Sequence, residues 1–406
     1  MKMTKRIFAL FLVTVLVLAL PACKEEPDTP EDSHLDWDYI LSPVSEGVVT
    51  ENGYYYSARG VLNYTDFATG KSAVLCAKPG CTHVPDAHGN NPCDAEMPFN
   101  GRYMFFENDT LYYLGDDNVL CSRDATGGSL KEWGMLGKKF IEDKMGLIAI
   151  PLALCNGYLY YEGYIIDIGK TNGVLSTSDA TSKCICRYNI AQQKDEVLVL
   201  LEDIGYYESI EPYAARENGL IYLYAEGLDP EQDWEKVDVK KRLEARKKMP
   251  VHIKHLNLMT GKTTTILTAT YGEVSSVADV YNGKLYYTKS LNDGNSTCEV
   301  QCYDLVTGKD TVVYTNVSPT SMGKGYWRCT KWIDAQTAEV HLYDMNAGKE
   351  VPHELKGNLG VMNRSEYGLV VVNPRTSDHS FISYDSLADG LQEDDLMFLY
   401  VGNWTT

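Results

Sequence analysis

"NGYLYYEG", residues 156–163, joins a turn dipeptide to a short run of aromatic and aliphatic residues. Asn-Gly supplies the positive φ angles that a tight hairpin needs, and tyrosine and leucine suit a half-buried strand. The phrase recurs as "NGYYYS" (52–57), "NDTLYYLG" (108–115), "NGLIYLYAEG" (218–227) and "NGKLYYTKS" (282–290), with weaker copies in "KGYWRCTKW" (324–332) and "YGLVVVNP" (367–374). Such repetition predicts a fold built from similar β units.

A second phrase follows each copy of the first. It is a strand-like run that reaches Asp or Asn and then turns, as in "IKHLNLMTGK" (253–262) and "QCYDLVTGK" (301–309). Successive units begin about 40 to 65 residues apart, which is the length of a four-stranded blade. We therefore predict an all-β fold, a β-propeller of seven blades in one domain at 37–406. Six or eight blades remain alternatives, and two β-sandwich domains fit the spacing less well.

One segment breaks the strand rhythm. "LDPEQDWEKVDVKKRLEARKKMP" (228–250) places Asp229 as an N-cap, Pro230 at the first helical position, acids early and bases late. This pattern predicts a helix over 229–248, inserted in the fourth blade. Its apolar stripe is expected to pack on the ring through Trp234, Val237 or Val239, Leu243 and Met249. The basic face would then be solvated, or would dock a partner.

The chain start indicates an exported protein. Lys2, Lys5 and Arg6 precede the apolar run 7–20, which is too short to span a bilayer comfortably, and "LPAC" follows. The segment resembles a bacterial lipobox, and the resemblance implies lipidation of Cys23 after removal of residues 1–22. The acidic stretch 23–36 is expected to be a flexible tether. We predict a cell-membrane protein that is lipid-anchored on the extracytoplasmic face; an ordinary secretory signal is the alternative.

Charge narrows the range of partners. The formal net charge is −19, and such an acidic surface repels phosphate backbones and anionic lipid headgroups. Nucleic acid is therefore excluded as a partner. The membrane contact is expected to come from the acyl chains on Cys23.

Three cysteines and two histidines lie in "LCAKPGCTHVPDAHGNNPC", residues 75–93. Cys76, Cys81, His83 and Cys93 are a complete ligand set for a tetrahedral structural zinc site, and the loop spacing lets them converge. A disulfide and free thiols remain alternative interpretations. His88 is expected to face solvent. The paired cysteines Cys184 and Cys186, and Cys298 and Cys302, are expected on strands as small core residues.

This loop and the strand phrases together resemble a group of uncharacterised β-propeller lipoproteins of Gram-positive gut anaerobes. In that family the loop reads roughly Leu-Cys-x-Lys-Pro-x-Cys-x-His and then Cys-Asn-Ala. The present chain differs by Asp94 in place of asparagine and by a longer gap before Cys93. The resemblance implies the fold and the location, and no activity.

The sequence contains no phosphate-binding glycine loop, nucleophile elbow or His-Glu-x-x-His motif, so no catalytic residue is assigned. A binding or scaffold module for a small molecule, a glycan, a peptide or an envelope protein is the favoured interpretation. The rival is a propeller enzyme, a hydrolase or lyase of extracellular glycan, with carboxylates at the central channel.

Overall fold

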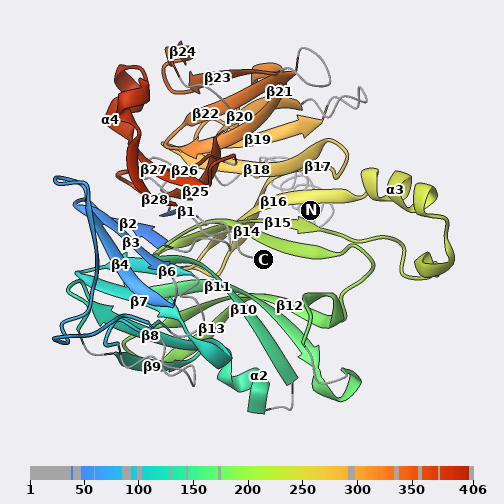
Figure 1. Ribbon diagram of the computed structural model, residues 1–406. Helices are drawn as coiled ribbons and strands as arrows, with labels where there is room; N and C mark the ends of the chain where they lie inside the picture. The colour runs from blue at the N-terminus through green and yellow to red at the C-terminus, as the bar shows by residue number, and fades with distance from the viewer. Residues whose placement is uncertain are drawn as a thin grey trace, which may run out of the picture.

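The computed structural model describes residues 38–39, 47–58, 60–84, 93–97, 103–128, 130–142, 145–171, 175–290, 298–332, 338–354, 359–373 and 375–401. In these residues the protein is almost entirely β-strand, and its sheets are arranged as a β-propeller (Figure 1). The helices among them are short: α2 (Lys138–Glu142), α3 (Val239–Lys247) and α4 (Tyr384–Asp389). The predicted all-β class is confirmed.

Apart from one short N-terminal strand described below, each sheet is formed by antiparallel strands that follow one another along the chain. The first contains β2 (Gly47–Val49), β3 (Gly53–Ala58), β4 (Val61–Asp66) and β5 (Lys71–Val74). The second contains β6 (Met104–Glu107), β7 (Thr110–Leu114), β8 (Val119–Asp124) and β9 (Lys131–Met135). The third contains β10 (Met145–Cys155), β11 (Tyr158–Asp167), β12 (Ala180–Asn189) and β13 (Lys194–Leu201).

The fourth sheet contains β14 (Ser209–Arg216), β15 (Gly219–Ala225), β16 (Pro250–Asn257) and β17 (Thr263–Thr270). A larger sheet follows, with β18 (Val274–Tyr281), β19 (Lys284–Ser290), β20 (Cys298–Asp304), β21 (Asp310–Gly323), β22 (Tyr326–Trp332), β23 (Ala338–Asp344) and β24 (Lys349–Val351). The last sheet contains β25 (Gly360–Arg364), β26 (Gly368–Val372), β27 (Asp378–Ser383) and β28 (Met397–Val401).

The inner strands form a closed series. Strand β2 contacts β6, and the contacts continue through β10, β14, β18, β21 and β25 back to β2. In the larger sheet the long strand β21 pairs with β20 through its first part and with β22 from Ser318 onward. The sheets therefore stand around a common centre, as in a propeller.

The repeated phrases correspond to the two hairpin turns of each unit. In the first, Asn156 and Gly157 have φ angles of 49° and 75°, which match a type I′ turn between β10 and β11. In the second, the Asp304 carboxylate accepts hydrogen bonds from the backbone N–H of Val306 at 3.0 Å and of Thr307 at 2.7 Å. The Asp-x-x-Thr phrase is thus an Asx-type turn, which explains its recurrence.

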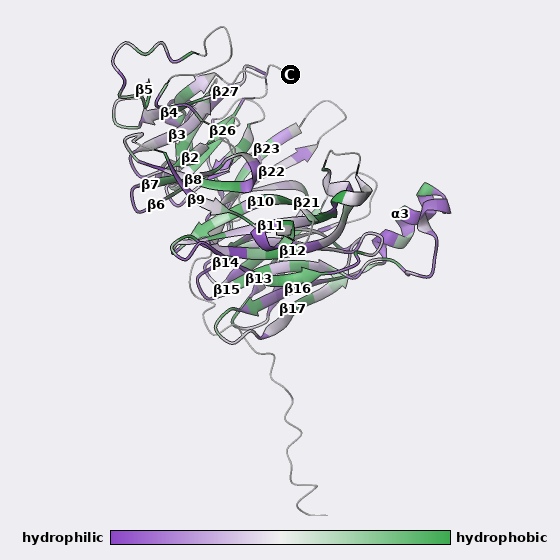
Figure 2. Ribbon diagram, turned by 90° about the horizontal axis from the view of Figure 1, so that it is seen from below, coloured by the Kyte–Doolittle hydropathy of each residue, from purple (hydrophilic) through white to green (hydrophobic). Residues whose placement is uncertain are grey.

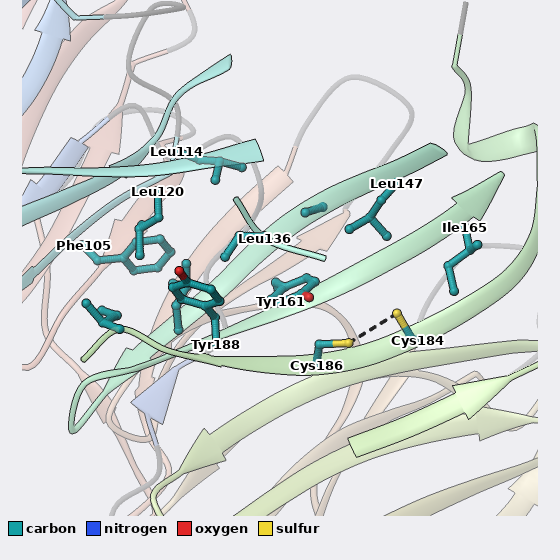
Figure 3. Packing of buried hydrophobic residues seen from close by; sticks show 13 residues of the cluster. Phe105, Leu114, Leu120, Leu136, Leu147, Tyr161, Ile165, Cys184, Cys186 and Tyr188 are labelled. Carbon is teal, nitrogen blue, oxygen red and sulfur yellow. Dashed lines mark hydrogen bonds between the residues drawn. The ribbon is translucent and has the colours of Figure 1, made fainter. Parts of the chain in front are cut away.

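Apolar side chains fill the space between neighbouring sheets. Between the second and third sheets, Leu120 and Leu136 pack against Tyr161 and Tyr188 (Figure 3). Each of the four side chains is 1% exposed or less. Burial of this extent is the main stabilising contribution of such a core, at about 25 cal/mol per Å².

The first and last sheets meet through side chains. Tyr400 of β28 stacks on Tyr56 of β3 with ring centroids 4.3 Å apart, and on His379 at the same distance. Phe67 and Phe381 stack at 4.1 Å. In the described part of the chain, no strand pairing connects these two sheets. This aromatic seam, which we define as Tyr56, Phe67, His379, Phe381 and Tyr400, therefore closes the ring.

Helix α3 is shorter than the helix predicted over 229–248. Helix α3 begins after the N-cap Asp238, whose side chain accepts from the N–H groups of Lys240 and Lys241, and a short 3₁₀ turn at Trp234–Lys236 precedes it. The predicted packing stripe is also wrong, because Val239 is 58% exposed and Leu243 is 46% exposed. Met249 alone is buried, just beyond the helix. Figure 1 and Figure 2 show α3 extending away from the sheets with a largely hydrophilic surface.

Two arginines attach α3 to the ring. Arg242 donates a hydrogen bond to the Tyr206 hydroxyl at 2.5 Å, and the guanidinium of Arg246 lies 4.2 Å from the centroid of the Tyr271 ring. These contacts are few and partly exposed.

Replacement of residues 230–247 by a short Gly-Ser linker is therefore expected to leave a folded ring. The unfolding free energy should fall by less than about 2 kcal/mol, since surface contacts of this kind contribute little. Urea unfolding followed by tryptophan fluorescence measures the change. A broad, non-cooperative transition would instead place α3 in the folding core.

The N-terminal strand β1 (Asp38–Tyr39) pairs with the inner strand β14 opposite Ala215 and Ala214 and contacts β10. The predicted leader at 1–22 and tether at 23–36, with Cys23, lie outside the described residues. In the described part of the chain, no helix has the length and apolar character needed to cross a membrane.

Candidate functional site

The cysteine and histidine loop follows the outer strand β5 of the first sheet. Backbone bonds fold it tightly, since the N–H of Cys76 donates to the carbonyl of Val74 and that of Cys81 to Lys78. Gly80 provides the positive φ of 72° that this turn requires. Cys93 returns to the same sheet, because the N–H of Leu62 donates to the carbonyl of Ala95 at 2.8 Å.

The structure brings the four predicted residues together. The ligand atoms of Cys76, Cys81, His83 and Cys93 all lie within 4.8 Å of one another. His83 points its Nδ1 at the Sγ of Cys93, 3.3 Å away. This group is somewhat wider than the roughly 3.5 to 4 Å that we expect between tetrahedral ligands. It could hold a metal ion after a small contraction. His88 lies outside the described residues.

Burial and hydrogen bonding act on these thiols in opposite directions. Burial raises the pKa of Cys76, but hydrogen bonds from the backbone N–H groups of Lys78 and Asp94 and from the neighbouring thiols outweigh it, so the pKa is lowered. Burial dominates at Cys93, which is 5% exposed, and raises its pKa. N–H groups directed at sulfur favour the thiolate, which is the form that binds metals.

A residue of the second sheet supports the loop. Arg123 of β8 is 7% exposed, and its guanidinium donates to the carbonyls of Asp94 at 2.5 Å, of Glu96 at 3.0 Å and of Gly128 at 3.0 Å. It also donates to the Tyr113 hydroxyl at 3.2 Å. Arg123 thus fixes the peptide units that follow Cys93.

The role of Arg123 was not predicted from the sequence. A signal was present, because Arg123 precedes the turn aspartate at a position that is Tyr188, Tyr303 or Tyr343 in other copies of the phrase. A charged residue at a repeat position that holds tyrosine in several other copies indicates a role specific to this sheet.

Substitution of Arg123 by alanine is expected to weaken metal binding by the loop about 10- to 100-fold, the usual effect of losing an outer-shell partner. Competition with a chromogenic chelator measures the affinity. Arg187, which bonds Glu196 on the third sheet, is the matched control, and R187A should bind metal as the unaltered protein does. Equal affinity of R123A and R187A would contradict a supporting role.

The described cysteines all carry free thiols. The disulfide interpretation of the loop is therefore not supported by their arrangement. Cys184 and Cys186 lie on one face of β12, fully buried, with their sulfurs 3.5 Å apart (Figure 3). The hydrogen bond with the Cys186 thiol, followed by burial, raises the pKa of Cys184, which fits an inert core position.

A cavity of about 780 Å³ opens where the inner strands β2, β6, β10 and β25 end in their turns. Aromatic rings form part of its wall, with Tyr55 stacked on Phe106 at 5.6 Å and tilted against Tyr64 at 4.7 Å between ring centroids. The charged residues that line it are Glu51, Glu107, Asp109, Lys324, Arg364 and Glu366. Glu107 is held by the N–H of Gly157 at 2.9 Å. The volume of the cavity falls in the range of small-molecule sites.

No family model matches the sequence, and no curated protein matches it. Among solved structures, the chain is similar to oligogalacturonate lyase in complex with manganese, at 11% identity and a TM-score of 0.45, over 86% of both chains. It is also similar to Pyrococcus horikoshii acylaminoacyl peptidase, at 10% identity and a TM-score of 0.47, over 90% of this chain and 54% of that chain. For TolB from Acinetobacter baumannii the identity is 12% and the TM-score 0.36, over 87% of this chain and 77% of that chain. Likeness at this level carries no information on activity, substrate or bound metal.

Proposed function

We propose that this protein is a lipid-anchored binding module on the extracytoplasmic face of the cell membrane. Its ligand would be a small molecule, a glycan, a peptide or a segment of an envelope protein. The observation that carries the proposal is the cavity of about 780 Å³ at the ends of the inner strands. Clefts of this size with a few convergent polar groups are the usual ligand sites of folded proteins.

Blocking the cavity tests the binding role. Asn52 is exposed on the cavity wall, and tryptophan in its place would fill part of the volume. In a ligand-observed NMR screen of sugars and peptides, N52W should lose the ligands that the unaltered protein binds. Q192W, on an exposed turn of the third sheet, is the matched control. If both variants keep every ligand, the cavity is not the binding site.

The anchor is proposed on Cys23. A lipid on this cysteine would hold the ring at the membrane through the stretch 23–36, since acyl chains partition into the bilayer. We expect the protein to sediment with membranes and to incorporate labelled palmitate, whereas C23A is expected in the soluble fraction without label. Equal fractionation of the two proteins would refute the anchor and leave the binding role standing.

The loop of Cys76, Cys81, His83 and Cys93 is proposed as a structural zinc site. Three sulfurs and one imidazole fit the preference of zinc for soft tetrahedral ligands. Four protein ligands would leave no open position for a substrate, so the proposed role is to order a loop that has few apolar side chains of its own.

The blade count is proposed as seven. In a seven-bladed ring, β21 would supply one strand to each of two neighbouring blades, and the larger sheet would divide between Val317 and Ser318. The closed series of inner-strand contacts supports it. On the same reading α3, which lies between β15 and β16, is an insertion in the fourth blade.

A further inference from the structure

A chain of polar side chains connects three successive inner strands. Asp279 of β18 is 4% exposed, and its Oδ2 accepts a hydrogen bond from the Ser321 hydroxyl at 3.0 Å. Ser321 of β21 is 8% exposed and accepts from Nη1 of Arg364 on β25, also at 3.0 Å. Burial raises the pKa of Asp279, while the nearby charge of Arg364 acts to lower it.

Burying such a network of polar side chains costs free energy. A carboxylate removed from water loses several kcal/mol of hydration, which hydrogen bonds recover only in part. Apolar side chains would fill the same place at lower cost. The network has one partly exposed end, and that end is Arg364 on the wall of the cavity. Ser321 and Asp279 therefore fix the direction of the Arg364 guanidinium.

The charged groups of the cavity are unevenly distributed. Lys324 and Arg364 come from the turn after β21 and from β25, and Glu366 is exposed in the turn that follows. Glu51, Glu107 and Asp109 come from the first and second sheets. Both cations of the cavity thus come from β25 and the turn after β21, whereas three of its four acids come from the first and second sheets, which also supply Tyr55 and Phe106.

We propose that the cavity recognises a monocarboxylate that also carries hydroxyl or ammonium donors, with Arg364 as the residue that binds the carboxylate. This inference rests on the proposed binding role, because it names the ligand class of the same cavity. The planar guanidinium matches a carboxylate, and Lys324 adds a second positive charge. The acids from the first and second sheets would accept hydrogen bonds from the donors of the ligand.

The acidic residues of the lining also argue against ligands of higher negative charge. A phosphate or a polyanion would bring a second negative charge toward Glu51, Glu107 and Asp109 and would be repelled. Acidic monosaccharides and short peptides share the required chemistry, a single carboxylate with several donors. The experiment separates these two sources.

The test uses matched acid and neutral probes with the mature protein in NMR titrations. The sugar pair is glucuronate and glucose, and the peptide pair is glycylglycine and its amide. At least one acid is expected to bind with a Kd on the order of 1 mM, and at least about tenfold more tightly than its neutral partner. The pair that shows this difference identifies the source.

Variants test whether Arg364 causes the tighter binding of the acid probe. R364Q is expected to lose the acid preference, and R364K to retain part of it, because lysine keeps the charge without the planar fork. S321A should weaken acid binding severalfold while the neutral partner is unaffected. R375Q, at an exposed arginine outside the cavity lining, is the matched control. R364K and S321A keep the test decisive if R364Q does not fold.

Three results would overturn the inference. One is equal binding of acid and neutral probes, another is an acid preference that is undiminished in R364K and S321A, and the third is binding of neither acid. A neutral ligand that N52W blocks would, in contrast, leave the proposed binding role intact while the carboxylate inference fails.

Discussion

Replacement of Cys93 by serine is expected to abolish the retention of zinc by the purified protein. Cys93 is the most buried of the four proposed ligands, and its sulfur faces His83 at 3.3 Å. Structural zinc sites of this composition bind with apparent free energies of about 10 to 16 kcal/mol at pH 7, and the loss of one thiolate removes a large share of it. Elemental analysis after dialysis should find one zinc per unaltered chain and none per C93S chain.

The stability of the protein should follow the metal. A chelator is expected to lower the melting temperature of the unaltered protein and to leave that of C93S unchanged, because only the former has metal to lose. Zinc affinity should also decrease as the pH falls. The pKa of Cys93 is raised in the metal-free fold, so its proton must be displaced on binding, and acid favours that proton.

Cys155 provides the matched control. It is a partly buried thiol on β10, away from the proposed ligands, so C155S should retain zinc. A metal-free unaltered protein from zinc-supplemented cells, or zinc bound equally by C93S, would contradict the site.

The second large effect is expected at the aromatic seam. Tyr56 is 4% exposed and stacks on Tyr400, so Y56A should lower the unfolding free energy by about 3 to 5 kcal/mol. Because the Tyr56 ring packs between the first and last sheets, the loss should appear there first. Hydrogen exchange should therefore accelerate in β2, β3 and β25–β28 before the other strands.

Two controls separate the seam from burial in general. Y56F keeps the stacked ring and should remain near the stability of the unaltered protein. Y160A removes an equally buried ring between the third and fourth sheets and should destabilise the protein without selective exchange in β25–β28. Uniform exchange in Y56A would show that the ring opens as one unit.

The strand units could be predicted from sequence because their signals are local. Asn156 and Gly157 specify a turn by their own φ preferences, and Asp304 caps its turn with its own carboxylate. The bounds of α3 were predicted less well, since Asp229 and Asp238 are both good N-caps and the structure begins the helix at the second. Helical periodicity also gave no means of telling whether Val239 and Leu243 would meet a neighbouring surface.

The four loop residues could be predicted by type and spacing, because zinc ligands come from a short list of side chains. Arg123 and the Asp279, Ser321 and Arg364 network depend on which sheets lie side by side. These contacts join residues up to 43 positions apart. No pattern within a single repeat contains that information.

The order in which the chain is synthesised gives the aromatic seam a further consequence. Strands β2 and β3 are made before the other sheets and β25–β28 after them, so the partner surface of Tyr56 leaves the ribosome later than every other sheet described. Until residue 400 has emerged, the nascent chain presents an apolar aromatic face at each open end of an incomplete ring. A chain that stops short of β28 therefore exposes the kind of surface that drives aggregation of unfinished chains.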